Sequence, residues 1–285
     1  MLVSLLIMTN VYGQADSINR KRMNTLVIGG ASVYTAGMFA LSELWYSESQ
    51  RQSWHTFDDS QEWKQVDKVG HFYTAFQLSH GMSKAFQWTG MNERKSDIWG
   101  SATGFLLMLP IEILDGFASS YGASMTDIVA NFTGSAIYLG QKLIWNDVRI
   151  HPKFSFRTTP YASERPDVLG ENTMQQILKD YNGQTYWLSF DIYGFLKEES
   201  KFPKWLNVAA GYGAEGMVYA NDSSNEAMGY DSYRQYYLGL DVDLTHIKSR
   251  KKGINTLLFF ANMIKIPAPT VEFSNNTTTF HWLYF

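Results

Sequence analysis

The pattern of hydrophobic and polar positions changes near residue 146, which predicts that the two halves of the chain fold differently. Before that point, apolar residues recur every three to four positions, as expected for helices. After it, apolar and polar residues alternate, which is typical of strands with two unlike faces. The pattern predicts an α+β protein: an N-terminal four-helix bundle followed by a C-terminal antiparallel β-rich region.

Helices are expected to fill most of the first half, with connections short enough for an up-and-down bundle. In the third helix Pro110 is expected to introduce a kink, and Gly134 and Gly140 should let the fourth helix approach its neighbours closely. The four helices are expected over residues 23–45, 67–88, 97–117 and 126–145.

The second half is expected to begin with an extended, proline-punctuated connector that contains one short helix, 173–180. Five or so strands are too few to close a membrane barrel, which needs about eight or more. We therefore expect a sheet that packs on the helices; the alternative is a sheet that pairs with another protein. The strands are expected over residues 186–193, 206–213, 238–244, 256–263 and 279–285.

The N-terminus carries a short apolar run, Leu2 to Met8, with Val11 and Gly13 placed as in a signal-peptidase site. The run is too short to span a bilayer. It lacks a preceding Lys or Arg, which departs from the usual signal pattern, and a buried strand is the alternative. The resulting division is a signal peptide at 1–13, a helical domain at 14–147, a connector at 148–182 and the β-rich region at 183–285.

Composition narrows the classes of partner. Lys and Arg number 24 against 27 Asp and Glu, so the chain lacks the basic character of a nucleic-acid-binding protein. The absence of cysteine excludes disulfides and a thiol nucleophile. Aromatic residues reach 15% while charged residues are only 18%, a balance that suits contact with membrane lipid. Composition therefore favours a cell-envelope protein.

Three polar patterns occur in the helical half, and their positions predict one convergent site. They lie at the start of the second helix, the end of the third and the start of the fourth. In an antiparallel bundle these three ends share one side. The expected members are Asp67, Lys68, His71, Glu112, Asp115, Ser124, Asp127 and Asn131.

The residue types of this cluster suit three kinds of chemistry. One histidine with several carboxylates is a ligand set for a divalent cation, although no cofactor is specified by the sequence. General acid–base catalysis is the second, with Asp67, His71 and Asp127 as catalytic candidates. The third is a buried ion-pair network, for example Lys68 with Glu112 and His71 with Asp115. The metal ligands would be Asp67, His71, Glu112, Asp115 and Asp127.

Two further interpretations of these polar residues carry less support. A catalytic triad of Ser124, His71 and Asp127 is conceivable, but no nucleophile elbow surrounds the serine. The remaining histidines lack partners at ligand spacing and are expected at the surface or in packing. These are His55, His80, His151, His246 and His281.

The order D-K-x-x-H-F, then E-x-x-D, then S-x-x-D-x-x-x-N-x-x-G resembles the YfiM-type family of uncharacterised bacterial envelope lipoproteins. It is more distantly similar to the VanZ-like membrane proteins. The resemblance covers residues 64–145 and implies a helical envelope domain without an established activity. The chain departs from that family in having no lipobox cysteine and in its long C-terminal region. This combination is similar to Bacteroidota envelope proteins and implies the outer membrane or its periplasmic face.

Together these features predict a non-enzymatic envelope protein that is a subunit of, or accessory to, an outer-membrane protein assembly. Its partners would be membrane lipid and a β-barrel or assembly-machinery protein, since an open sheet edge invites strand addition. The alternative is a metal-dependent or acid–base enzyme that acts on lipid or cell-wall fragments at the membrane surface. Sequence alone leaves open whether any reaction is catalysed.

Overall fold

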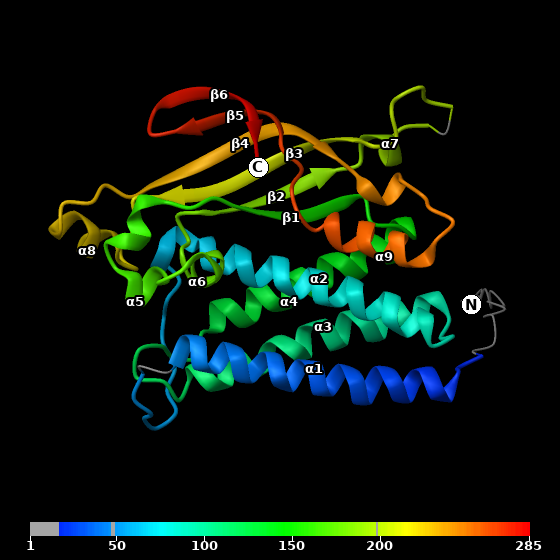
Figure 1. Cartoon of the computed structure of the whole chain (residues 1–285), viewed down its shortest axis with the longest axis horizontal. Coiled ribbons are helices and arrows are strands. Elements are labelled where there is room, and N and C mark those ends of the chain that lie inside the picture. Colours follow the sequence, from blue (N-terminus) through cyan, green and yellow to red (C-terminus); the bar gives the residue numbers. More distant parts are fainter. Residues whose placement is uncertain (1–16, 47–48, 198) are drawn as a thin grey trace, which may run out of the picture.

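A computed structural model describes residues 17–46, 49–197 and 199–285 and arranges them as a layer of helices beneath an antiparallel sheet (Figure 1). The expected signal peptide, 1–13, lies outside the described residues. The longer helices are α1 Arg20–Tyr46, α2 Val66–Trp88, α3 Glu93–Asp115, α4 Met125–Trp145, α6 Thr173–Lys179 and α9 Lys252–Ala261. The shorter ones are η1 Glu62–Gln65, η2 Pro160–Ser163, α5 Pro166–Leu169, α7 Ile192–Phe195, α8 Asp222–Ala227 and η3 Leu244–His246.

The sheet is a six-stranded antiparallel meander in which each strand pairs with the next along the chain. Its strands are β1 Ile150–Phe156, β2 Gln184–Phe190, β3 Leu206–Glu215, β4 Tyr233–Val242, β5 Ala268–Ser274 and β6 Thr277–Tyr284. The mixed helix-and-sheet class expected from the sequence is confirmed.

Helices α2, α3 and α4 pack against one another through small residues. A Cβ atom on Gly104 would lie 2.3 Å from the Ser79 hydroxyl, and one on Gly134 would lie 2.2 Å from the Phe72 carbonyl oxygen. Ser79 in turn donates a hydrogen bond to Ser135 across the interface. Small residues let helix backbones approach closely, so the interior of this layer is small and polar.

Helix α1 is attached to this three-helix unit much more loosely, and a closed four-helix bundle is not confirmed. None of the residues of α1 is buried. It lies alongside α3 (Figure 1), to which Tyr34 and Tyr46 hydrogen-bond. By length and composition, α1 and α3 are the two described helices that could cross a membrane, which is weak evidence alone. Near the N-terminus, an apolar helix such as α1 also fits a signal sequence.

The sheet buries its small and polar side chains and exposes apolar ones. On β4, Tyr237 and Asp241 are buried whereas Leu238 and Leu240 are exposed. The opposite face of β1 to β3 packs on α2, where Tyr186 and Tyr212 contact Val66. Over β4 to β6 the apolar face is uncovered. Alternation in the sequence therefore gave the two faces of the strands, while the inward direction of the polar face did not follow from it.

Two segments differ from the expected strand pattern. Residues 256–263, expected as a strand, lie mostly in helix α9, because a short, uninterrupted apolar run fits either element and its neighbours decide. The connector expected over 148–182 begins with β1, whose Pro152 had suggested irregular backbone. The ring of Pro152 is tolerated because β1 is the first strand of the sheet. Strand β5 was not expected.

Candidate functional site

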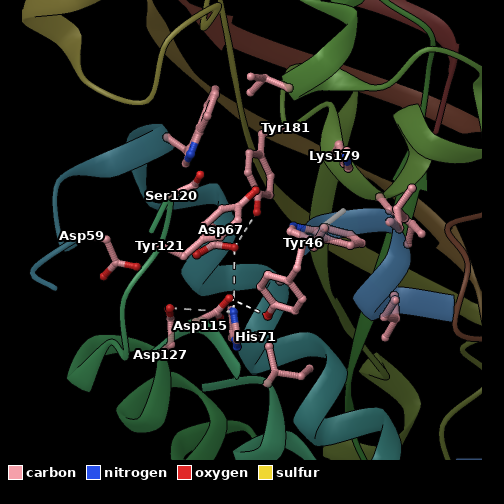
Figure 2. Close-up of a pocket in the computed structure, with 18 of the residues that line it drawn as sticks. Tyr46, Asp59, Asp67, His71, Asp115, Ser120, Tyr121, Asp127, Lys179 and Tyr181 are labelled. Atoms are coloured by element: carbon pink, nitrogen blue, oxygen red, sulfur yellow. Dashed lines mark hydrogen bonds and ion pairs between the residues drawn. The ribbon is translucent and has the colours of Figure 1, made fainter. Parts of the chain in front are cut away.

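The polar residues predicted to converge do meet, at the end of the helical layer where α1 and α3 end and α2 and α4 begin (Figure 2). Four of them, Asp67, His71, Asp115 and Asp127, line a cavity of about 970 Å³ that is also bordered by α5 and α6. Ser124 caps α4 by accepting a hydrogen bond from the Asp127 amide, 3.1 Å away. This cap fixes the first turn of α4, and hence Asp127, at the cavity wall.

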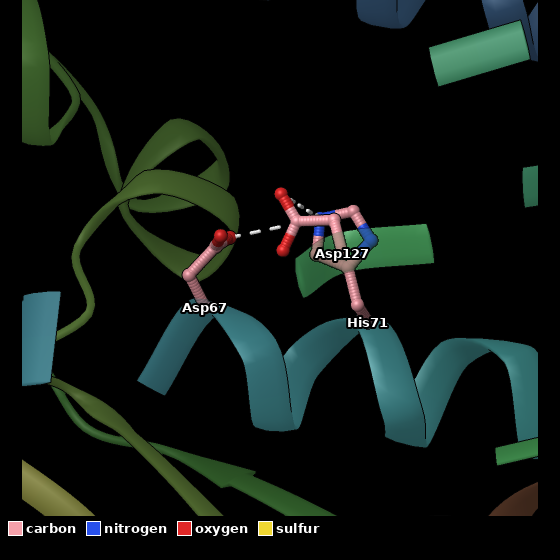
Figure 3. Close-up of side chains that lie close together, drawn as sticks. All are labelled: Asp67, His71 and Asp127. Atoms are coloured by element: carbon pink, nitrogen blue, oxygen red, sulfur yellow. Dashed lines mark ion pairs between the residues drawn. The ribbon is translucent and has the colours of Figure 1, made fainter. Parts of the chain in front are cut away.

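One ring nitrogen of His71, Nε2, faces the carboxylates of both Asp67 and Asp127 (Figure 3). This nitrogen is 3.8 Å from Asp67 Oδ1 and 3.9 Å from Asp127 Oδ2. Both distances are too long for hydrogen bonds. One ligand atom from each of the three residues lies within 4.8 Å of the others, which fits bonds of about 2.0–2.6 Å to one shared divalent cation. Among the described residues, these three are the ones whose side chains are of metal-ligand type and lie close enough together to share one ion.

The other ring nitrogen of His71 is held by Asn131. Nδ1 lies 3.1 Å from Asn131 Oδ1, and since an amide oxygen only accepts, the proton belongs on Nδ1. In the neutral ring, which is the form that binds a metal, the lone pair of Nε2 is then directed toward Asp67 and Asp127. Asn131 is fully buried, and its amide nitrogen lies 3.5 Å from Glu112 Oε1. Such a partner on the second nitrogen is what orients metal-binding histidines in proteins.

Lys68 neutralises the carboxylate oxygens that face away from His71. Its Nζ lies 3.0 Å from Asp67 Oδ2, 2.7 Å from Asp127 Oδ1 and 2.5 Å from Asp59 Oδ2. Asp127 Oδ1 has no partner of hydrogen-bond geometry, so its contact with Lys68 is ionic. The expected pairing of Lys68 with Glu112 is wrong. Lys68 thus holds the two carboxylates through Asp67 Oδ2 and Asp127 Oδ1, so that Asp127 Oδ2 and Asp67 Oδ1, which also accepts from Tyr181, face His71.

Asp59 is a member of the cluster that sequence reasoning missed. It lies in the loop between α1 and α2 and accepts hydrogen bonds from Ser124, at 2.6 Å, and Thr126, at 2.9 Å. Because the Ser124 hydroxyl is directed to Asp59, the conceivable triad with His71 and Asp127 is not formed. The adjacent pair Asp58–Asp59 was the signal available in the sequence.

Three tyrosines, also missed, border the acidic groups. Tyr46 donates to Asp115 Oδ1 at 2.6 Å, and Tyr181 donates to Asp67 Oδ1 at 2.6 Å (Figure 2). Tyr121 packs edge-on against Tyr46. They come from α1, the loop after α3 and the turn before β2. Nothing local in the sequence marked these positions, because long-range packing brings them to the cavity.

Burial and charge shift the pKa values of these groups in opposite directions. Burial would raise the pKa of Asp67, but the charges of His71 and Lys68 outweigh it and lower that pKa. Burial would lower the pKa of His71, but Asp67, Asp127 and Glu112 raise it. Burial raises the pKa of Asp127 to about 6, against the opposing charge of His71. Carboxylates with separated affinities for protons are typical of sites that move protons or bind cations.

Glu112 and Asp115 lie farther from the His71 Nε2 position than Asp67 and Asp127 do. Glu112 is on the Nδ1 side, with Oε1 3.6 Å away, and burial raises its pKa to about 8. Burial likewise raises the pKa of Asp115 to about 6, although Tyr46 donates to it. Glu112 and Asp115 therefore lie next to the group of Asp67, His71 and Asp127 and are not part of it.

The other histidines lie apart from this cluster. His80 is packed against Tyr138 and Phe259, as expected for a core residue. His151 approaches a buried carboxylate on the sheet side, with Nε2 3.4 Å from Asp243 Oδ2. His246, three residues along the chain from Asp243, lies 3.7 Å from the same oxygen, and His281 Nε2 lies 2.8 Å from Glu272 Oε2, so these three histidines have acidic partners that were not expected.

Comparison with known proteins finds a family match for part of the chain. Residues 52–139 match the model of DUF2279, a family of predicted periplasmic lipoproteins. The match covers α2 and α3, most of α4 and the loop that carries Asp59, and so contains the whole Asp67–His71–Asp127 group. It supports an uncharacterised family of bacterial envelope proteins. No curated protein and no solved structure matches the chain.

Proposed function

We propose that the protein is a metal-dependent enzyme of the cell envelope, with a divalent cation held by Asp67, His71 and Asp127. One observation carries the proposal: Nε2 of His71 and one oxygen of each aspartate converge at metal-ligand spacing on the wall of a large cavity. Three protein ligands with an open side toward a cavity are the arrangement of catalytic zinc sites. A bound ion there would lower the pKa of a coordinated water and make it a nucleophile.

The residues around the three ligands have distinct roles in this proposal. Asn131 sets the tautomer of His71, and Lys68 orients Asp67 and Asp127 through their outer oxygens. Asp115, which lines the cavity and whose pKa is raised to about 6, is placed to give or take a proton beside the ion, whereas Glu112 lies on the Nδ1 side of His71. The set of ligands therefore favours a hydrolytic reaction on a molecule bound in the cavity.

The test is metal analysis of the full chain, gently extracted from its membrane fraction and washed free of loose ions. We expect close to one equivalent of a transition-metal ion in the unaltered protein and a loss of at least tenfold in His71→Ala and Asp127→Asn. His246→Ala serves as the matched control, because it removes a histidine that also faces aspartates. The proposal would be overturned if the protein contained no metal and its melting temperature did not change on addition of Zn²⁺ or Mn²⁺.

A second candidate function, a non-enzymatic subunit of an outer-membrane assembly, is favoured by the uncovered face of the sheet. An apolar row crosses five strands in register, and β6 has no strand beyond it in the described sheet. The row consists of Leu188, Ala210, Leu238, Val271 and Phe280. Exposed apolar surface beside an open edge is what a partner that adds strands would use.

Cross-linking distinguishes this second function from the first. A photo-reactive residue in place of Leu238 or Phe280 should capture one outer-membrane protein in cells, whereas one in place of exposed Met174, on α6, should not. If the protein remains a monomer without cross-links at all photo-reactive positions, that result would count against a docking role. The likeness to YfiM-type and VanZ-like proteins, and a Bacteroidota outer-membrane setting, belong to this proposal and rest on the residues that carry the resemblance.

Membrane lipid is the further partner that we propose, on the outer faces of α3 and α4. Large apolar side chains there are exposed while the buried residues are small or polar, the reverse of a water-soluble bundle. Examples are Trp99, Leu106, Val129, Phe132 and Ile144. Flotation of the protein with vesicles, and its loss when Leu106 and Phe132 are both replaced by Glu, tests this contact.

A further inference from the structure

Helix α1 lies beside α3, and two of its tyrosines hydrogen-bond to α3. Tyr34 donates to the Leu107 carbonyl oxygen at 2.7 Å, and Tyr46 donates to Asp115 Oδ1 at 2.6 Å. The two tyrosines are separated along α1 by about 18 Å at the usual helical rise. Between them, Met38 and Leu41 face the cavity and remain only partly buried. The cavity therefore continues from the polar cluster into the space between α1 and α3.

The two ends of this cavity differ in chemistry. Along the last turns of α1 and α3 its walls include aliphatic and thioether side chains, and beside the first turns of α2 and α4 they are carboxylates and histidine. The apolar walls are Met38, Leu41, Leu44, Met108, Ile111 and Leu114. An apolar channel that opens onto polar groups matches a molecule with the same division.

We infer that the ligand of this cavity is an amphiphile: its hydrocarbon chain lies between α1 and α3, and its headgroup faces Asp67, His71 and Asp127. The inference rests on the proposed function, because it names the substrate class of that same site. Burial of the chain is driven by removal of apolar surface from water, and it would cover the aliphatic wall that α1 leaves partly exposed. The length of the ligand's hydrocarbon chain determines how far the headgroup reaches into the polar cluster.

Before the ion is bound, this end favours a headgroup that donates hydrogen bonds and carries no negative charge, such as a sugar or an ammonium group. The carboxyl groups at this end include five of the polar cluster, with Glu62 beside them, and Lys68 is already shared by three of the five. At the rim, Lys179 lies over the ring of Trp45, and Arg165 lies over that of Tyr219. Neither cation is directed at the cluster, so an anionic headgroup would meet like charge. The acidic members are Asp59, Asp67, Glu112, Asp115 and Asp127.

The experiment is calorimetric titration of the full chain, exchanged from detergent into an amphipathic polymer, with monomeric probes that differ in one part. Dodecyl maltoside and dodecylammonium carry the two donor headgroups, octyl maltoside shortens the chain, and dodecyl phosphate reverses the charge. Each methylene that enters the channel strengthens binding about fourfold, so octyl maltoside should bind at least tenfold more weakly than dodecyl maltoside. In protein freed of metal by a chelator, dodecyl phosphate should bind at least tenfold more weakly than the better donor probe.

Leu41→Trp fills the channel and should weaken binding of dodecyl maltoside at least tenfold. Val33→Trp, on the exposed side of α1, is the matched control and should leave binding unchanged. Met38→Trp repeats the test from one turn away if Leu41→Trp loses helix content. Equal affinity for the octyl and dodecyl probes, or unaltered binding in both channel variants, overturns the inference. Metal content measured on the same samples keeps this failure separate from failure of the metal proposal.

Discussion

His71 and Asn131 lie 60 residues apart in the chain, and His71 Nδ1 is 3.1 Å from Asn131 Oδ1. The contact joins α2 to α4 and determines which nitrogen of His71 faces the cavity. It is made possible by close approach of the two helices, which Gly134 permits one turn farther along α4. The metal proposal therefore depends on a packing detail as much as on the ligands themselves.

Replacement of Asn131 should weaken metal binding without removing any ligand. In Asn131→Ala we expect the dissociation constant for Zn²⁺ or Mn²⁺ to rise about 10- to 100-fold, as for other residues that orient metal-binding histidines. Titration with a competing chelator measures it. Asn207→Ala, which empties an equally buried asparagine within the sheet, should lower stability but leave the affinity unchanged. Equal affinity in Asn131→Ala would show that this contact does not act on the site.

Lys68 should be needed for stability most when no cation is bound. Lys68→Met leaves three neighbouring carboxylates without their shared partner, and removing one member of a buried ion pair costs about 3–5 kcal/mol. Denaturant unfolding in the presence of a chelator should show this loss. A divalent cation should restore part of it, because the ion would screen Asp67 and Asp127. A loss that saturating Zn²⁺ or Mn²⁺ leaves unchanged would contradict a cation position between them.

Two glycines on α4 should respond to alanine in opposite directions. A Cβ on Gly134 would lie 2.2 Å from the Phe72 carbonyl oxygen, so Gly134→Ala should separate α4 from α2 and cost about 1–3 kcal/mol. Gly140 has no neighbouring atom within 4 Å of that position, and Gly140→Ala should stabilise the helix by about 0.5–1 kcal/mol. Thermal unfolding of the two variants compares them directly. Equal effects would mean that close contact at Gly134 is not required.

Periodicity was enough to predict the positions of α2, α3 and α4, and the order of those helices was enough to bring Asp67, His71, Glu112 and Asp127 to one end. It was not enough to predict the residues that loops deliver, as Asp59 and Tyr181 show. The expected role of Gly140 in close helix packing was wrong, since no neighbour lies there. A glycine pattern marks which residues are small, whereas the packing direction of the helix decides which of them matter.

The sheet was harder to predict, because both faces of its strands carry hydrophobic side chains. Trp187 and Leu188 are adjacent and both hydrophobic, yet the first is buried and the second exposed. Which face turns inward depends on the buried polar network around Lys153 and Asp241, whose Nζ and Oδ2 are 2.6 Å apart. Lys153 is on β1 and Asp241 is on β4, far apart in the chain, so their pairing leaves no local trace in the sequence.

The same network makes stability depend on pH through Lys265. Its side chain is buried, and its Nζ donates to the carbonyl oxygens of Leu240 and Ile266 at 2.7 and 2.8 Å. Asp241 is 3.9 Å away and is paired more closely with Lys153. Burial therefore lowers the pKa of Lys265 from its ordinary value of 10.5 to about 8, in spite of the Asp241 charge.

Stability should consequently rise as the pH increases above 8. Below pH 8 both the folded and the unfolded chain keep the proton on Lys265, and the cost of the buried charge is constant. Between pH 8 and 10.5 the folded chain has released it while the unfolded chain still binds it, so the free energy of unfolding increases with pH by up to roughly 3 kcal/mol. Lys265→Met should remove this rise, and exposed Lys252→Met should retain it. The quantity to compare is the difference in unfolding free energy between each variant and the unaltered protein from pH 7.5 to 9.5, because the tyrosines titrate alike in all three; a difference independent of pH for Lys265→Met would contradict the assignment.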